Sequence, residues 1–195
     1  IAPSPIMSRI SRETPKQMTI IEISEIVEAH ESAAVRVRRG NLDGVELLSA
    51  FGYLPAAFLS PYSNTRTDEY GGSLENRMRF LLQTINAVRA GIGQDRILGV
   101  RLPGDEKVVG GLTQSDLQEI AKLLAQTGLV DYLNIIVGTN YERSGRMEHW
   151  PPTPAPHGLF VPLAAGIKSQ VAIPVFTAGR ITDPAMANTI IERGE

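Results

Sequence analysis

Residues 43–82 read DGVELLSAFGYLPAAFLSPYSNTRTDEYGGSLENRMRFLL, and this stretch sets the pattern of the whole chain. It opens with a short apolar run, 43–50, of the kind that forms a buried strand. A long connection rich in tyrosine, asparagine and glycine follows. Ser73 is then a suitable N-cap for an amphipathic helix that ends near Gly91 or Gly93. The stretch therefore predicts a strand, a long connection and a helix.

The same unit of strand and helix recurs toward the C-terminus, and one more helix precedes it. Apolar runs predict further strands at 96–102, 131–137 and 173–178. Apolar spacing and caps predict helices at 20–39, at 113–126 with Thr113 or Ser115 as cap, at about 161–170, and from Asp183 to about Arg193. Residues 1–19 contain three prolines among polar residues and are expected to form an irregular lead-in. This alternation predicts a parallel sheet with right-handed crossovers.

Two α/β architectures satisfy this alternation: a doubly wound sheet, and part of an eight-stranded (β/α)8 barrel of the TIM type. No GxGxxG fingerprint follows any of the expected strands, which argues against a dinucleotide-binding sheet. A complete barrel needs about 250 residues, so four units make only a partial barrel. No low-complexity tract marks a linker, and we expect one domain, 1–195, without an internal boundary.

Composition excludes several classes of protein. The chain has 195 residues, 43% of them hydrophobic, and its 19 basic and 21 acidic side chains give a formal charge of −2. Near-neutral charge without a basic stripe argues against nucleic acid as a partner. The absence of cysteine excludes disulfides and thiolate-bound metal centres within these residues, and no histidine spacing indicates a metal site. No apolar run is long enough to span a membrane, so we expect a cytoplasmic protein.

The stretch 43–82, together with GVRL at 99–102 and AGRITDP at 178–184, resembles the old yellow enzyme family of flavin-dependent oxidoreductases. This family includes ene-reductases, dienoyl-CoA reductases and amine dehydrogenases or demethylases, and the similarity is densest over 58–82. The resemblance covers essentially the whole chain. It implies an FMN-binding barrel of which these residues supply strands four to seven. We therefore expect a fragment of a longer polypeptide, or a chain that associates with further copies.

The resemblance implies roles for four residues at the ends of the expected strands. Tyr53 matches a tyrosine that donates a proton to the substrate; the alternative is a half-buried tyrosine that anchors its loop. Arg101 matches an arginine at the N1 and C2 carbonyl edge of the flavin, where a fixed positive charge stabilises the reduced ring. The alternative for Arg101 is a structural ion pair with Glu46 or Asp105.

Gly179 and Arg180 match a phosphate seat after the seventh strand of the barrel, formed by backbone N–H groups and a guanidinium.

The chain departs from the family pattern directly after its first strand. The family usually has His-x-x-His or His-x-x-Asn there, a pair that hydrogen-bonds the substrate, whereas this chain has Leu48 and Phe51. We expect both to line a more apolar substrate site. The connection after the third strand offers polar and aromatic replacements, Asn140 and Tyr141 first, with Arg143, His149 and Trp150 beyond them. His149 and His157, in a proline-rich loop, are expected at the surface.

The string RTDEYGGSLENR, 66–77, is expected to act as a scaffold. Its charged residues predict an ion-pair network that fixes the connection above the start of the following helix, and they are Arg66, Asp68, Glu69, Glu75 and Arg77.

The first functional hypothesis is an FMN-dependent oxidoreductase. In its complete form it would transfer hydride from NADH or NADPH through the flavin to a small unsaturated substrate, an enone or a dienoyl compound. One alternative within the family is an amine dehydrogenase or N-demethylase. An alternative of a different class is a non-catalytic, flavin-free half-barrel, because an open four-stranded sheet exposes two edges and an apolar face that would favour association.

Overall fold

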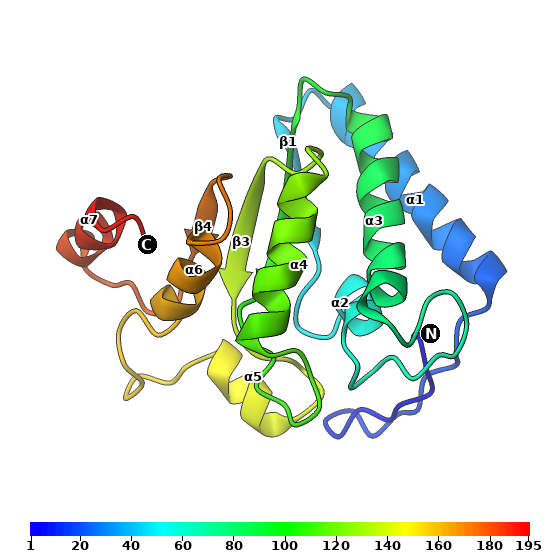
Figure 1. Ribbon diagram of the computed structural model, residues 1–195, viewed down its shortest axis with the longest axis horizontal. Coiled ribbons are helices and arrows are strands. Elements are labelled where there is room, and N and C mark those ends of the chain that lie inside the picture. The colour runs from blue at the N-terminus through cyan, green and yellow to red at the C-terminus, as the bar shows by residue number, and fades with distance from the viewer.

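A computed structural model describes residues 1–195, which form four strands and seven helices (Figure 1). In chain order the elements are α1 (Ile20–Arg39), β1 (Gly44–Leu48), α2 (Leu54–Leu59), α3 (Leu74–Ile92), β2 (Ile97–Pro103), α4 (Gln114–Gln126), β3 (Tyr132–Ile136), α5 (Arg143–His149), α6 (Val161–Lys168), β4 (Val175–Thr177) and α7 (Pro184–Glu192). Every expected strand and helix is present, with ends within three residues of the predicted ones. The short helices α2 and α5 are additional.

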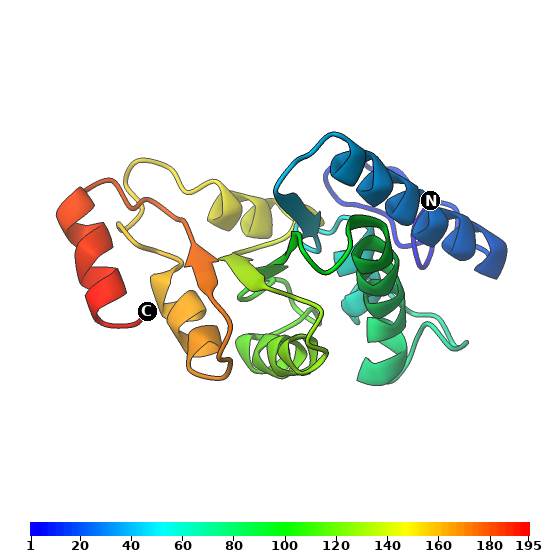
Figure 2. The ribbon, with the colours of Figure 1, turned by 90° about the horizontal axis from the view of Figure 1, so that it is seen from above.

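The four strands form one parallel sheet in the order β1-β2-β3-β4. Each strand pairs with the next one along the chain, and Leu48, Arg101, Asn134 and Phe176 lie side by side across the sheet. Helices α3, α4 and α6 lie on one side of this sheet (Figure 2). A doubly wound sheet would reverse its strand order and carry helices on both faces. The sequential order with helices on one side is instead the winding of an α/β barrel, here over four strands.

The main core lies between the sheet and its helices. Alternate residues of each strand point toward the helices and are buried there, among them Leu47, Leu98, Val100, Leu102, Leu133 and Ile135. The residues between them point to the face without helices, where Leu48 and Phe176 are partly exposed. This alternation places the side chain of Arg101 on the helix-free face.

The helix ends follow the predicted caps. The Ser73 hydroxyl accepts the N–H of Asn76 at the start of α3, and Thr113 forms a capping box with Asp116 at the start of α4. Asp183 caps α7, with Pro184 in its first turn. These caps fix where each connection after a strand ends.

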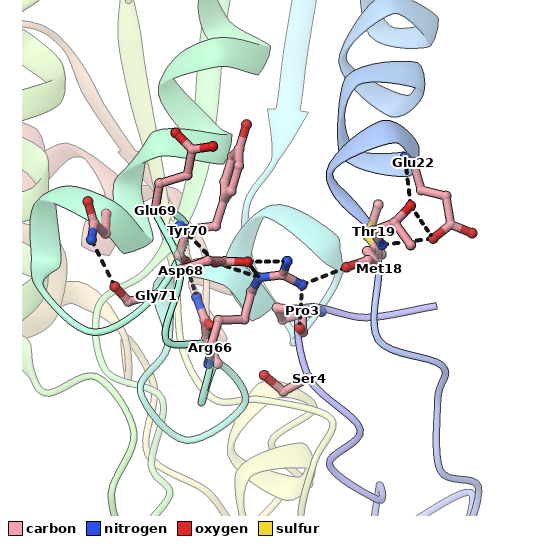
Figure 3. Close-up of polar contacts among 12 residues, drawn as sticks. Pro3, Ser4, Met18, Thr19, Glu22, Arg66, Asp68, Glu69, Tyr70 and Gly71 are labelled. Atoms are coloured by element: carbon pink, nitrogen blue, oxygen red, sulfur yellow. Dashed lines mark hydrogen bonds and ion pairs between the residues drawn. The ribbon is translucent and has the colours of Figure 1, made fainter.

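The connection between β1 and α3 is held to the lead-in by Arg66 (Figure 3). The Arg66 side chain is almost wholly buried, and its Nη1 donates to the carbonyls of Pro3 at 3.0 Å and Met18 at 2.7 Å. Its Nη2 pairs with Asp68 Oδ2 at 2.6 Å. The lead-in is therefore irregular, as expected, yet fixed in place.

The expected ion-pair network in the string 66–77 is wrong in part. The pair of Arg66 and Asp68 is present, but the Glu69 and Glu75 side chains form no ion pair. Arg77 donates instead to backbone carbonyls, to Leu59 at 2.7 Å and to Gly72. Arginines in this connection therefore satisfy chain carbonyls more than carboxylates, because the irregular backbone leaves those carbonyls without strand or helix partners.

None of the helices has the length and apolar character needed to cross a membrane.

Candidate functional site

The carboxyl ends of the strands surround a pocket of about 400 Å³. It is lined by Phe51, Arg101, Ile136, His149, Trp150, Pro151, Phe160, Ala178, Gly179 and Arg180. We call it the Arg101 pocket. Because parallel strands bring their carboxyl ends to one edge, residues that follow β1, β2, β3 and β4 meet there. The structure thus brings Arg101, Gly179 and Arg180 together in one hollow.

Arg101 is held by a carboxylate on the neighbouring strand. Its Nη2 lies 2.6 Å from Glu46 Oε1, and the other oxygen of Glu46 accepts from Tyr132 Oη at 3.0 Å and from Asn134 Nδ2 at 2.9 Å. Burial, and then the bond to Glu46, raises the pKa of Tyr132 to about 12, so its hydroxyl stays a donor. The ion pair of Arg101 with Glu46 is therefore present, and Asp105 pairs with Lys107 instead. Three strands position one guanidinium.

Pairing with Glu46 does not use all of the Arg101 guanidinium. Its Nε is buried and has no hydrogen-bond partner. A buried donor without an acceptor is costly, so the pair with Glu46 leaves the hydrogen-bonding capacity of Arg101 incompletely satisfied.

Gly179 and Arg180 form a tight turn after β4. Both have left-handed backbones, with φ of +91° and +60°. A Cβ at Gly179 would lie 2.6 Å from the Phe160 ring, so this position requires glycine. Arg180 donates to the Pro152 carbonyl at 3.2 Å, while its buried Nε has no partner. Arg180, which lines the Arg101 pocket, thus also has an unpaired guanidinium N–H.

His149, at the end of α5, was expected at the surface, and this expectation is wrong. It is half-buried in the wall of the Arg101 pocket, with its ring centroid 3.6 Å from that of Phe51. Burial, and then the charge of Arg101, lowers the pKa of His149, so its imidazole is neutral at pH 7. Its Nδ1 is buried without a partner. His157 is exposed, as expected.

Of the expected substrate contacts, Phe51, His149 and Trp150 line the Arg101 pocket. Phe51 is 8% exposed and packs with Ala50 and Ile136. Leu48 lies one strand over from Arg101 on the helix-free face, outside the pocket lining. Asn140 is also outside it; the Asn140 backbone N–H donates to the Phe51 carbonyl at 3.0 Å.

Tyr53 and Tyr141 line a different hollow, of about 490 Å³, between the lead-in and the start of α2. Tyr53 is 54% exposed. Tyr141 is half-buried, donates to the Gly52 carbonyl at 3.2 Å, and has its pKa raised to about 12, chiefly by burial. The turn at Phe51 and Gly52, both with positive φ, separates the two hollows. The structure therefore does not bring Tyr53 into the Arg101 pocket.

Glu106, just after β2, is a buried carboxyl that the sequence reasoning missed. Its Oε2 accepts from Ser60 Oγ and from the Leu112 backbone N–H, both at 2.6 Å, and its Oε1 has no partner. Burial raises the pKa of Glu106 to about 7. It ties the loop that follows β2 to the end of α2. No sequence signal distinguishes it from the exposed acidic residues around it.

Comparisons with known proteins match the chain over almost its full length. Residues 3–195 match the NADH:flavin oxidoreductase / NADH oxidase family. The chain is 40% identical over 194 residues to an NADH oxidase of Thermoanaerobacter brockii and 38% identical over 200 residues to an N,N-dimethylglycine/sarcosine dehydrogenase of Chromohalobacter salexigens. In both cases all of this chain is covered, but only 29% and 28% of the relative.

Among solved structures, a 2-naphthoyl-CoA reductase in complex with 2-naphthoyl-CoA superposes with a TM-score of 0.89 at 33% identity. The match covers 100% of this chain and 29% of that protein. The chain therefore spans less than a third of the length of these relatives.

Proposed function

Because the chain belongs to the NADH:flavin oxidoreductase / NADH oxidase family, we propose that it forms the flavin-binding part of an FMN-dependent oxidoreductase. The family confirms the expected cofactor class, a flavin used together with a nicotinamide donor. The observation that carries the proposal is the Arg101 pocket, where Arg101, Gly179 and Arg180 meet although they are up to 79 positions apart in the chain (from 101 to 180).

The residues of the Arg101 pocket fit FMN. Its volume of about 400 Å³ lies within the usual range for ligand sites. Two buried guanidinium N–H groups, Arg101 Nε and Arg180 Nε, need acceptors, and FMN carries acceptors on its pyrimidine edge and on its phosphate. Arg101 would hold the pyrimidine edge, and the turn at Gly179 and Arg180 would hold the phosphate. When bound, FMN would supply the capacity to accept and pass on a hydride.

The Arg101 guanidinium would stabilise negative charge on the bound ring, and Glu46 would set how strongly it does so. Glu46 fixes the orientation of Arg101 and neutralises part of its charge through the contact at 2.6 Å. The wall formed by Phe51 and the neutral His149 would exclude water and so strengthen the interactions of Arg101 and Arg180 with a bound anion.

The favoured substrate is a small unsaturated compound, an enone or a dienoyl compound. The apolar wall at Phe51 suits such a compound. The name of the similar 2-naphthoyl-CoA reductase indicates that this relative acts on an unsaturated acyl compound. Tyr53 would donate its hydroxyl proton to the carbon beside the one that receives hydride. This role requires the substrate to extend from the Arg101 pocket past the turn at Gly52.

Amine oxidation is the second candidate function. The imidazole of His149 lines the pocket and is neutral, so it would accept a proton from an alkylammonium group bound there. The similar N,N-dimethylglycine/sarcosine dehydrogenase acts on methylated amines by its name.

The test begins with FMN binding by the purified full-length protein. We expect a yellow protein that retains about one FMN, and weaker retention in Arg101→Ala. Arg36→Ala, on the exposed face of α1, is the matched control and should bind FMN normally. A protein that stays colourless and takes up no added FMN would overturn the proposal; if it were also a stable oligomer, the flavin-free half-barrel would replace it. Flavin absorbance changes of the reduced protein with enones and dienoyl thioesters, and of the oxidised protein with alkylamines, then decide between the two substrate classes.

A further inference from the structure

A separate hollow of about 800 Å³ lies between the lead-in and α5. It is lined by Arg9, Ile10, Arg12, Glu142, Arg143, Ser144, Arg146, Met147 and Trp150, and we call it the arginine pocket. Its lining carries four guanidinium groups and one carboxylate, a net charge of +3, in a chain whose formal charge is −2. The positive charge is therefore a local concentration and not a general property of the surface.

Most of this charge has no carboxylate partner. Arg9 Nη1 pairs with Glu142 Oε1 at 3.1 Å, whereas Arg12, Arg143 and Arg146 form no ion pair. Like charges gathered around one hollow repel each other, and they raise the local concentration of anions there. Guanidinium groups bind phosphate oxygens through paired, charge-assisted hydrogen bonds. The arrangement of the arginines thus favours a phosphate-containing ligand that carries more than one negative charge.

The two walls of the arginine pocket are fixed relative to each other. The Arg9 backbone N–H donates to the Tyr141 carbonyl at 3.2 Å, next to the ion pair of Arg9 with Glu142. The lead-in turns back at Arg12, which has a left-handed backbone with φ of +57° and whose N–H donates to the Ser8 carbonyl at 2.8 Å. In Figure 1 this part of the lead-in and α5 lie at the same end of the molecule, beyond the carboxyl ends of the strands. The arginines are thus presented by a folded frame and not by loose termini.

The arginine pocket also has an apolar wall. Met147 and Trp150 are 54% and 58% exposed, although large apolar side chains usually lie inside a protein. The Arg146 guanidinium lies 5.0 Å from the centre of the Trp150 ring. A flat ring beside guanidinium groups suits a ligand that combines an aromatic base with phosphates.

Trp150 lines both the arginine pocket and the Arg101 pocket, so the two hollows adjoin at this side chain. We propose that the arginine pocket binds the diphosphate of a nucleotide, with its base against Trp150, and so anchors a ligand whose reactive end lies in the Arg101 pocket. That the reactive end of the ligand lies in the Arg101 pocket rests on the proposed function, whereas the nucleotide site itself does not. A nucleoside diphosphate group can belong to the nicotinamide donor or to a thioester substrate that carries a nucleotide.

ADP binding to the purified full-length protein, measured by calorimetry, tests the site. We expect ADP to bind more tightly than adenosine, and the double variant Arg143→Ala/Arg146→Ala to weaken ADP binding by about tenfold or more through lost charge-assisted bonds. The variant Arg143→Lys/Arg146→Lys should recover part of this loss. Arg36→Ala/Arg39→Ala, on exposed positions of α1, removes the same charge elsewhere and should bind ADP normally.

Kinetics of the same variants distinguish the two sources of the nucleotide. A raised KM for NADH or NADPH alone would identify the donor, and a raised KM for the thioester alone would identify the substrate; either supports the proposal. No ADP binding at millimolar concentration, or equal loss in the α1 control, would overturn it. FMN content is measured on each preparation. Normal FMN content without ADP binding would refute the proposed nucleotide site alone. ADP binding without FMN would refute the proposed flavin function alone.

Discussion

Replacement of Glu106 by glutamine should change how stability depends on pH. Glu106 is 1% exposed, and its Oε2 accepts hydrogen bonds from Ser60 and from the backbone of Leu112. Burial raises the pKa of Glu106 from 4.5 to about 7 in the folded protein. The fold therefore prefers the protonated carboxyl, because the charged form loses its hydration without gaining a cationic partner.

The sign and size of the effect follow from this pKa difference. The stability that the protonated carboxyl contributes is fully present below about pH 4.5 and is lost as the pH rises through about 7. Each pKa unit corresponds to about 1.36 kcal/mol, so a difference of about 2.5 gives a loss of about 3 kcal/mol at pH 8. Glu106→Gln keeps an oxygen to accept both hydrogen bonds and cannot ionise. It should escape this loss.

Urea unfolding at several pH values between 4.5 and 8.5 measures the effect. The free energy of unfolding of Glu106→Gln minus that of the unchanged protein should rise by about 3 kcal/mol across this range. Glu25→Gln removes an exposed carboxyl on α1 and serves as the matched control. A pH-independent difference for Glu106→Gln would refute the reasoning, since it would mean that Glu106 stays ionised in the fold throughout.

Three further predictions concern the proposed flavin function. Glu46→Gln removes the carboxylate 2.6 Å from Arg101 and should raise the reduction potential of bound FMN. The shift is on the order of 30 mV for each 1.4 kcal/mol of added stabilisation of the reduced form. An unchanged or lower potential in a spectroelectrochemical titration would contradict this. Tyr53→Phe should slow alkene reduction by about 10² to 10⁴-fold while reduction of the flavin by the donor persists, and equal loss in both stopped-flow half-reactions would indicate a structural role. Gly179→Ala places a Cβ against Phe160 at a backbone φ of +91°, so it should cost about 1–3 kcal/mol of stability in urea unfolding and lower FMN retention; normal values of both would show that the turn is not constrained.

The sequence predicted the elements whose signals are local. Helix α4 shows a clear apolar period and a capping box at Thr113, and the apolar runs of the strands stand out against polar connections. Helix α2 could not be recognised because its six residues include five that are buried, which leaves no polar face and no period. Helix α5 has seven residues and precedes Pro151 and Pro152, so it is too short for a helical pattern to emerge.

The convergence of Arg101 with Gly179 and Arg180 was also predictable, because parallel strands share one carboxyl edge. The separation of Tyr53 from this pocket was not, since it depends on two successive left-handed residues, Phe51 and Gly52. Nothing in the sequence marks Phe51 as left-handed, a conformation that residues other than glycine seldom adopt. The burial of His149 likewise depends on where α5 comes to lie.

The buried guanidinium of Arg66 makes the lead-in indispensable to the rest of the chain. Proteolytic removal of residues 1–18 would strip this cation of the Pro3 and Met18 carbonyls and leave it short of acceptors in a dry interior. The same stretch carries Arg9 and Arg12, half of the cationic lining of the arginine pocket. Arg66, 54 positions further along the chain than Arg12, thus holds the irregular lead-in in place. It thereby also positions two of the arginines that we propose bind phosphate.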